Sequence, residues 1–317
     1  MRGNGQSRIK IVFAGTPEFA VPSLRQIHRD PRIEVVAVYT QPDRPAGRGR
    51  RARVSAVKHA ALDFSIPVLQ PASLTTTTAI ERFSSHGAEL HVVVAYGLLL
   101  PQAIIGQSQL ALNIHASLLP RWRGAAPIQR AIMAGDCETG ISVMRIVEAL
   151  DAGPILLGRS CTIADTDTAG SLHDKLAMLG AACLKTVIDD YRVTGLVEVP
   201  QNEAEVSYAH KISPRERALD WTRGADSLAR HVRALNPSPV ATMRLGATNI
   251  KVWSAVALMR TPLNCNRPGD VVAASDIGID IATANGALRI THLQPEGKRS
   301  MSAADFVNGF HHLLNPA

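Results

Sequence analysis

The 317-residue chain is poor in aromatic residues, charged residues and cysteine. Aromatic residues make up 4% of it and charged residues 19%, whereas hydrophobic residues make up 46%. Its four cysteines, spread from Cys137 to Cys265, form no CxxC pair, which argues against a disulfide scaffold or a zinc ribbon. No run of about 18 apolar residues exists, and the first apolar run is too short for the core of a signal peptide. We therefore expect a folded cytosolic protein with no membrane association.

The common nucleotide-binding and hydrolase motifs are also missing. The chain has no GxxxxGK[ST] sequence and no GxSxG sequence. Residues 47–52 formally match GxGxxA, but the strand predicted before them ends at Tyr39, and the variable positions are all arginine. A pyrophosphate-binding turn needs its strand directly before it, so we reject this match and expect no nucleotide cofactor.

The first half of the chain alternates short apolar runs with helix-like segments. The runs of strand length are residues 9–13, 33–39, 90–95 and 110–115. This alternation predicts an α/β fold, a doubly wound Rossmann-like domain with a mostly parallel sheet. Ligands bind beyond the carboxyl ends of strands in such sheets, so we expect the chemistry just after Tyr39, Ala95 and Ile114.

The pattern changes after a predicted helix at residues 169–191. Short strands separated by Gly and Pro turns then follow, at residues 241–245, 250–257, 270–273, 278–282 and 287–293. Five such strands predict a smaller OB-like β-barrel domain. We expect a catalytic domain at residues 1–190, a linker at 191–207 and a second domain at 208–317.

Positive charge is concentrated in two places. The formal net charge is +7, and residues 210–317 hold 13 Lys and Arg against 8 Asp and Glu, a net charge of +5. The other concentration is a run of five arginines without an acid: Arg44, Arg48, Arg50, Arg51 and Arg53. Arginine suits phosphate because its guanidinium binds oxygen pairs, so we interpret this run as a mobile phosphate-binding loop. A solvated surface loop is the alternative.

The polar residues of greatest interest lie at the end of a predicted strand. Asn113 and His115 are two residues apart, so their side chains point to the same side of the strand. Two such donors can stabilise an oxyanion, and His can also move a proton near neutral pH. Asp151, in a segment bounded by Gly153 and Pro154, is the candidate acid that orients the His.

These residues belong to a stretch that resembles the folate-dependent formyltransferase family. The family signature Asn-x-His-x-Ser-Leu-Leu-Pro, followed by basic-aromatic-x-Gly, stands here at residues 113–124. Further segments resemble the tRNA-formylating members of the family: residues 13–19, 40–49, 94–97, 124–129, 208–212, 220–221, 233–237 and 293–298. The sequence departs from the common family pattern at Val147, Ala149 and Ser238.

The resemblance implies the site residues and the substrates. It assigns catalysis to Asn113, His115 and Asp151, and contact with the tRNA acceptor end to the arginine run. It also implies that the basic second domain, residues 208–317, binds tRNA. It assigns folate binding to Ser117, Leu118, Leu119, Pro120, Tyr96 and Gly97. The donor it implies is 10-formyltetrahydrofolate and the acceptor is initiator methionyl-tRNA, with no metal and with a monomeric enzyme.

Two other functions stay open at this point. One is formyl transfer from the same folate to a small amine, such as an amino sugar nucleotide or glycinamide ribonucleotide. The other is a catalytically inactive RNA-binding relative. A small acceptor gives no reason for the arginine run or the basic second domain, and an inactive relative gives none for the intact trio of Asn113, His115 and Asp151.

Overall fold

The computed structural model describes residues 8–46, 51–258 and 267–314. The chain divides into two compact units. The first unit contains Met1–Gly124, Thr139–Cys161 and His173–Tyr208; the second contains Ala125–Glu138, Thr162–Leu172 and Ala209–Ala317. Two segments from the middle of the chain thus pack with the C-terminal part, whereas the domain limits expected from sequence stay a prediction. No helix within the described ranges is long and apolar enough to cross a membrane.

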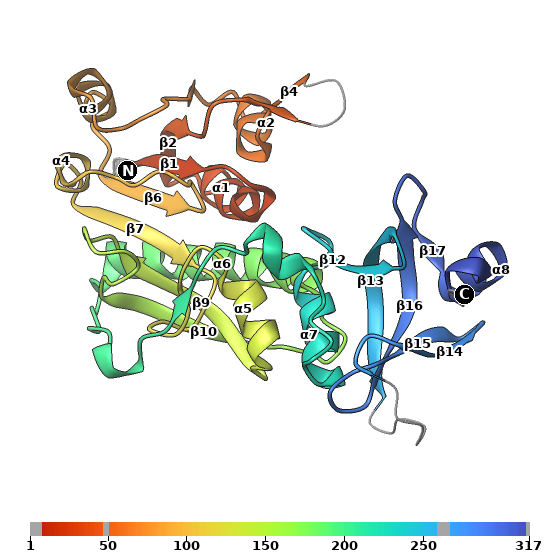
Figure 1. Ribbon diagram of the computed structural model, residues 1–317. Coiled ribbons are helices and arrows are strands. Elements are labelled where there is room, and N and C mark those ends of the chain that lie inside the picture. Colours follow the sequence, from red (N-terminus) through yellow and green to blue (C-terminus); the bar gives the residue numbers. More distant parts are fainter. Residues whose placement is uncertain (1–7, 47–50, 259–266, 315–317) are drawn as a thin grey trace. The chain divides into compact units, whose positions relative to one another are not determined.

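A seven-stranded sheet forms the centre of the first unit, in the order β10-β9-β7-β6-β1-β2-β5 (Figure 1). Its strands are β1 (Ile9–Gly15), β2 (Ile33–Tyr39), β5 (Val68–Leu69), β6 (Leu90–Val94), β7 (Leu110–His115), β9 (Glu138–Arg145) and β10 (Ile155–Thr162). Strand β1 pairs in parallel with β2 and β6, and β6 pairs in parallel with β7. Every residue of β6 is buried, as both faces of a covered parallel sheet require. The strands predicted at residues 9–13, 33–39, 90–95 and 110–115 are confirmed.

Helices link the parallel strands of this unit. They are α1 (Val21–His28), α2 (Ala56–Asp63), α3 (Thr77–Ser84) and α4 (Gln102–Ile105), with the short 3-10 helix η1 (Glu18–Ala20) before α1. The long helix α6 (Ala169–Val193) follows strand β10. The predicted helix at residues 169–191 is confirmed by α6. Gly180 lets α6 approach the sheet closely, because a Cβ there would lie 3.1 Å from Ile114 and 3.6 Å from Ile141. The helix therefore packs against the two strands, β7 and β9, that carry or flank the candidate site.

One part of the sheet differs from a simple parallel arrangement. Strand β9 pairs antiparallel with β7, with His115 opposite Ser142. Strand β10 was not expected, because its sequence shows no clear alternation and its side chains are mostly half-buried or exposed. The loop between β9 and β10 contains Asp151, so this pair of strands brings the acid back to β7.

The arginine run forms a β-hairpin rather than the expected irregular loop. Strands β3 (Arg44–Ala46) and β4 (Arg51–Arg53) pair antiparallel, with Arg44 opposite Arg53 and Ala46 opposite Arg51. Arg48 and Arg50 lie outside the described residues.

Asp43, directly before the hairpin, is held by a compact polar network. Its Oδ2 accepts a hydrogen bond from Lys58 Nζ at 2.6 Å, and its Oδ1 accepts one from Gln70 Nε2 at 2.8 Å. Gln70 Oε1 also accepts from Lys58 Nζ at 2.7 Å. The Lys58 ammonium holds the pKa of the Asp43 carboxyl below its usual range. The network attaches the base of the hairpin to helix α2.

Buried His91 on β6 makes the stability of the first unit depend on pH. The residue is 3% exposed, its Nδ1 has no hydrogen-bond partner among the described residues, and burial lowers its pKa from 6.5 to about 4. Between these values the unfolded chain binds a proton that the folded chain excludes, so stability present above about pH 6.5 is lost as the pH falls towards about 4. We expect the free energy of unfolding in urea to fall by about 2 kcal/mol through this residue between about pH 8 and about pH 5.

The His91→Leu variant provides the comparison, because it cannot take up the proton. Over the same pH interval, the decrease in its free energy of unfolding should be about 2 kcal/mol smaller than the decrease in the wild type. Equal pH dependence in the two proteins would contradict the assignment.

The second unit contains a six-stranded antiparallel sheet. Its strands are β12 (Ala241–Leu245), β13 (Thr248–Leu258), β14 (Val271–Ser275), β15 (Gly278–Ala282), β16 (Ala287–Pro295) and β17 (Met301–Ser302), in the order β12-β13-β16-β15-β14 with β17 beside β16. The helices are α5 (Pro127–Ala134), α7 (Ala225–Ala234) and α8 (Ala303–Phe310). Leu228 and Val232 of α7 and Phe306 of α8 join the strand residues in one core. The expected OB-like fold class and its five strands are confirmed, and β17 is an additional short strand.

Several short elements complete the chain. They are β8 (Arg123–Gly124), β11 (Tyr208–Ala209), η2 (Glu203–Glu205), η3 (Pro214–Arg217) and η4 (His311–Leu313). Ser302 caps helix α8, because its hydroxyl accepts a hydrogen bond from the Asp305 backbone N–H at 3.1 Å.

Candidate active site

Asn113, His115 and Asp151 lie together in the first unit. Asn113 Nδ2 donates to Asp151 Oδ1 at 3.4 Å, and His115 Nδ1 lies 3.6 Å from Asp151 Oδ2. Two of these side chains come from the end of β7, and the third comes from the loop between β9 and β10. The alternation of the strand thus brings Asn113 and His115 to one side, as the sequence predicts.

The Asp151 carboxylate is fixed by the main chain of Gly124. The Gly124 N–H donates to Asp151 Oδ2 at 2.9 Å, and the Asp151 side chain is 11% exposed. Asp151 itself adopts a φ of +50°, a left-handed conformation that costs a non-glycine residue about 1–2 kcal/mol. Surrounding contacts must therefore hold the loop in this form.

The ring of His115 is oriented by a main-chain carbonyl. His115 Nε2 lies 2.8 Å from the carbonyl oxygen of Trp122, which can only accept, so Nε2 carries the proton. When the ring is neutral, this tautomer leaves the lone pair of Nδ1 on the side of Asp151. The Trp122 carbonyl thus holds one ring nitrogen, and the orienting role that the sequence predicted for Asp151, whose Oδ2 lies 3.6 Å from the other nitrogen, stays a prediction. A main-chain acceptor leaves no signal in the sequence.

Several polar groups of the predicted folate-binding loop after β7 form hydrogen bonds within the protein. The Ser117 hydroxyl donates to the Arg121 carbonyl at 2.6 Å, and Ser142 Oγ donates to the Ser117 carbonyl at 2.8 Å. Ser142 Oγ also accepts from Leu119 N at 3.0 Å. Ser117 and Leu119 are buried, whereas Leu118 and Pro120 are half-buried. The loop is thus built on Ser117 and Ser142, and its less buried members are those that a ligand can reach.

Tyr96 and Gly97 follow β6 at the same end of the sheet. The Tyr96 side chain is 1% exposed, and only its main chain takes part in contacts at the edge. The Tyr96 carbonyl accepts from Thr16 Oγ1 at 2.9 Å and from Gln41 Nε2 at 3.2 Å. Gly97 has a φ of +82°, and a Cβ there would lie 2.3 Å from the Gln41 amide nitrogen. The sequence did not identify Thr16 or Gln41, which fix this edge through side-chain amide and hydroxyl groups.

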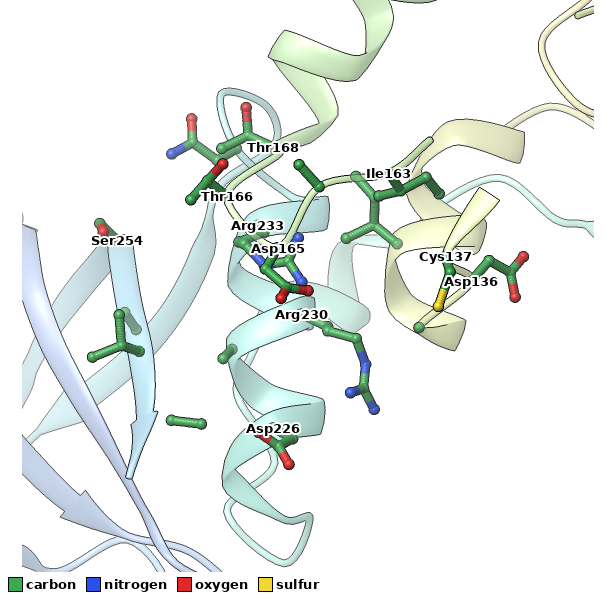
Figure 2. A pocket seen from close by; sticks show the side chains of 18 of the residues that line it. Asp136, Cys137, Ile163, Asp165, Thr166, Thr168, Asp226, Arg230, Arg233 and Ser254 are labelled. Carbon is green, nitrogen blue, oxygen red and sulfur yellow. The ribbon is translucent and has the colours of Figure 1, made fainter. Parts of the chain in front are cut away.

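A separate cavity of about 580 Å³ lies within the second unit (Figure 2). Helix α5, residues 163–168, helix α7 and strand β13 line it. Its charged lining is mixed, because Arg230 and Arg233 face it together with Asp136, Asp165 and Asp226. Arg233 is engaged, since its Nη1 donates to the Asp167 carbonyl at 2.8 Å. None of the residues predicted for catalysis, folate binding or tRNA binding lines this cavity.

The trio has the chemical groups that acyl transfer to an amine requires. The Asn113 amide can donate to a developing oxyanion, and His115 Nδ1 can take a proton. The Asp151 carboxylate can stabilise the positive charge that this proton creates. These three groups can therefore support transfer of an acyl group to an amine.

Comparison with known families agrees with this class of reaction. Residues 7–188 match the formyl transferase family, and residues 211–311 match the formyl transferase C-terminal domain. The chain belongs to the formyl transferase family.

The individual relatives are more specific. A methionyl-tRNA formyltransferase from Methylococcus capsulatus is 52% identical over 301 residues, which cover 95% of this chain and 96% of that protein. Another from Hydrogenovibrio crunogenus is 46% identical over 301 residues, which cover 94% of this chain and 95% of that protein.

Solved structures of lower identity share the fold. A methionyl-tRNA formyltransferase from Clostridium thermocellum has a TM-score of 0.55 and 15% identity, covering 78% of this chain and 92% of that chain. HypX from Aquifex aeolicus in complex with tetrahydrofolic acid has a TM-score of 0.63 and 18% identity, covering 98% of this chain and 48% of that chain. At these identities the likeness concerns the fold alone.

Proposed function

We propose that this protein transfers the formyl group of 10-formyltetrahydrofolate to the α-amino group of methionyl-initiator tRNA. The relatives that are about half identical along nearly the whole chain, all methionyl-tRNA formyltransferases, are the observation that carries the proposal. The convergence of Asn113, His115 and Asp151 supports it independently, because these groups fit the chemistry of formyl transfer.

In the proposed reaction the methionyl amine attacks the formyl carbon. The carbon–nitrogen bond to the amine forms while the carbonyl oxygen becomes an oxyanion, which accepts a hydrogen bond from the Asn113 amide. His115 Nδ1 takes a proton from the attacking amine, and the Asp151 carboxylate stabilises the resulting imidazolium. The oxyanion then re-forms the carbonyl as the bond to the folate nitrogen breaks, and that nitrogen takes the proton from His115, so atoms and charge balance.

The folate is proposed to lie at the edge of the sheet between two loops. The main chain of Tyr96 and Gly97 offers polar atoms on one side, and the half-buried Leu118 and Pro120 offer apolar surface on the other. These residues fit a ligand that has both ring surface and amide-like groups. Ser117 and Leu119 would act through the shape of the loop, because their side chains are buried.

The arginine hairpin is proposed to attract tRNA phosphates. We expect replacement of Arg44, Arg51 and Arg53 by Gln to raise the KM for methionyl-tRNA about tenfold or more and to lower the slope of log KM against log salt by up to about 3. The reason is that each lost phosphate contact releases about one counterion less. Initial rates at several salt concentrations measure both quantities, and the KM for the folate donor should stay within about twofold.

A control variant removes the same charge elsewhere on the first unit. Arg8, Arg25 and Arg29 are exposed, and replacing them by Gln changes the net charge of the protein by the same amount. This variant should keep most of the salt slope. Equal slopes in the two triple variants would show that net charge rather than the hairpin attracts the RNA.

A parallel acceptor assay tests the proposed function itself. Labelled formyl donor is incubated with the protein and with charged initiator tRNA, uncharged initiator tRNA or small amines. Transfer only to the charged tRNA is the expected result. Transfer to small amines alone would refute the proposal, and tRNA binding without any transfer would point to an inactive RNA-binding relative.

A further inference from the structure

Gln201 connects the segment expected to be a linker to the loop that carries Asp151. Its Nε2 donates to two carbonyl oxygens of that loop, those of Asp151 at 2.8 Å and Gly153 at 2.7 Å. Its Oε1 accepts from Arg123, from Nε at 3.0 Å and from Nη2 at 2.8 Å. Carbonyls only accept and a guanidinium only donates, so these four contacts fix the orientation of the amide.

The Asp151 loop has a strained and tightly packed backbone that these hydrogen bonds from Gln201 can hold in place. Asp151 has a positive φ, and Gly153 lies so close to the chain opposite that a Cβ would be 1.8 Å from the Arg145 carbonyl oxygen. Both carbonyls that flank this tight turn are those that Gln201 holds. The hydrogen bonds from Gln201 therefore act on the backbone that sets the direction of the Asp151 carboxylate.

Arg123 holds the other end of the Gln201 amide and is itself anchored. It is 3% exposed, and its Nη2 donates to Glu203 Oε1 at 2.7 Å. Burial is the largest single influence and disfavours the charged guanidinium, but the hydrogen bonds that Arg123 donates to Glu203 and Tyr208, together with the attraction of these groups, raise the pKa of Arg123 above its ordinary value. Arg123 stands directly between Trp122, whose carbonyl orients His115, and Gly124, whose N–H holds Asp151. Gln201, Arg123 and Glu203 are thus connected through the chain to both main-chain groups that hold the candidate site, the Trp122 carbonyl and the Gly124 N–H.

The surrounding segment, residues 198–207, is tied to the first unit along its length. Its further contacts are Glu198 with Arg145, Val199 with Ile155, and Ser207 with Trp122 and Arg123. This segment shows no hydrophobic periodicity in the sequence, because its residues bond through polar side-chain groups and main-chain atoms rather than through an apolar face. The segment is therefore part of the wall behind the candidate site.

We propose that Gln201 is a positioning residue for formyl transfer, which with Arg123 and Glu203 holds the Asp151 carboxylate and the His115 ring in their reactive arrangement. This inference rests on the proposed function. Gln201 touches no reacting atom in it; it acts through the backbone of Asp151 and Gly153 and through Arg123.

The Gln201→Glu variant separates positioning from anchoring. A carboxylate keeps its contact with Arg123 and gains an ion pair, but it places an oxygen against the two loop carbonyls in place of a donor. We expect kcat for methionyl-tRNA formylation to fall about 10- to 100-fold, since small displacements of reacting groups have effects of this size. The KM values for donor and tRNA should change less than about threefold, and the midpoint of thermal unfolding should be retained.

Asn202 provides the matched control, because it is the exposed neighbour in the same segment and contacts only Ala204 and Glu205 among the described residues. The Asn202→Asp variant makes the same amide-to-acid change and should keep kcat within about twofold of the wild type.

A second comparison uses the Asp151→Asn background. In this background the Asp151 carboxylate is already absent, so its position no longer affects the rate. Gln201→Glu should then lower kcat less than about threefold. An unchanged kcat in the single variant, a loss that only follows the unfolded fraction, or the full loss in the Asp151→Asn background would each overturn the inference. A wild-type protein without activity on methionyl-tRNA would instead refute the proposed function.

Discussion

Replacing Asp151 by Asn is expected to lower kcat for formyl transfer by about 10⁴-fold, the scale seen when the acid beside a catalytic His is neutralised. The carboxylate now accepts from two donors, the Gly124 N–H at 2.9 Å and the Asn113 amide at 3.4 Å. An Asn side chain has one oxygen, so its NH2 group must face one of these donors. The variant also removes the negative charge that stabilises a protonated His115. The loss should fall on kcat, because these effects matter most when charge develops.

The measurement combines single-turnover rates with equilibrium binding of a folate that cannot transfer its formyl group. Folate affinity should stay within about threefold of the wild type. Glu148 is an exposed acid in the same loop, and Glu148→Gln should leave the rate nearly unchanged. Retained turnover in the Asp151→Asn variant would remove this residue from the mechanism, and a loss of the folded state in thermal unfolding would assign it a structural role.

The sequence predicted those strands and helices whose buried side chains form a continuous apolar run or a regular pattern. The runs that became β2 and β7 were predicted to the residue, because most of their side chains are apolar and buried. Strand β10 was missed because it is largely exposed and its residues follow no alternation. The hairpin of β3 and β4 was missed because its arms are short and its arginines indicated a loop.

The side chains of the candidate site could be predicted from the sequence, but the main-chain groups that hold them could not. Asn113 and His115 share a strand two residues apart, and Asp151 stands in a loop marked by Gly and Pro, so local patterns identified all three. The groups that hold them are the Trp122 carbonyl and the Gly124 N–H, which every residue type possesses. Gln201 reaches the site across 50 residues of sequence, and a single glutamine in an aperiodic segment gives no local sign of such a contact.

Replacing Asn113 by Ala is expected to lower kcat by about 10²- to 10³-fold, the usual cost of removing one donor to a developing oxyanion. The Asn113 side chain is half-buried at the end of β7, and its amide reaches the Asp151 carboxylate only at 3.4 Å. A long hydrogen bond of this kind leaves the amide free to turn towards an oxyanion once substrate is bound. Truncation should therefore weaken stabilisation of the transition state more than it weakens the fold.

The Asn113→Asp variant sharpens this test, because it keeps the shape of the side chain and replaces the donor by a second carboxylate 3.4 Å from Asp151. Repulsion between the two acids should make it at least as slow as Asn113→Ala. The double variant Asn113→Ala with Asp151→Asn should be about as slow as the slower single variant, since residues that act together are not additive. Losses that simply multiply in the double variant would show that the two side chains act independently, and normal turnover of Asn113→Ala would mean that another group stabilises the oxyanion.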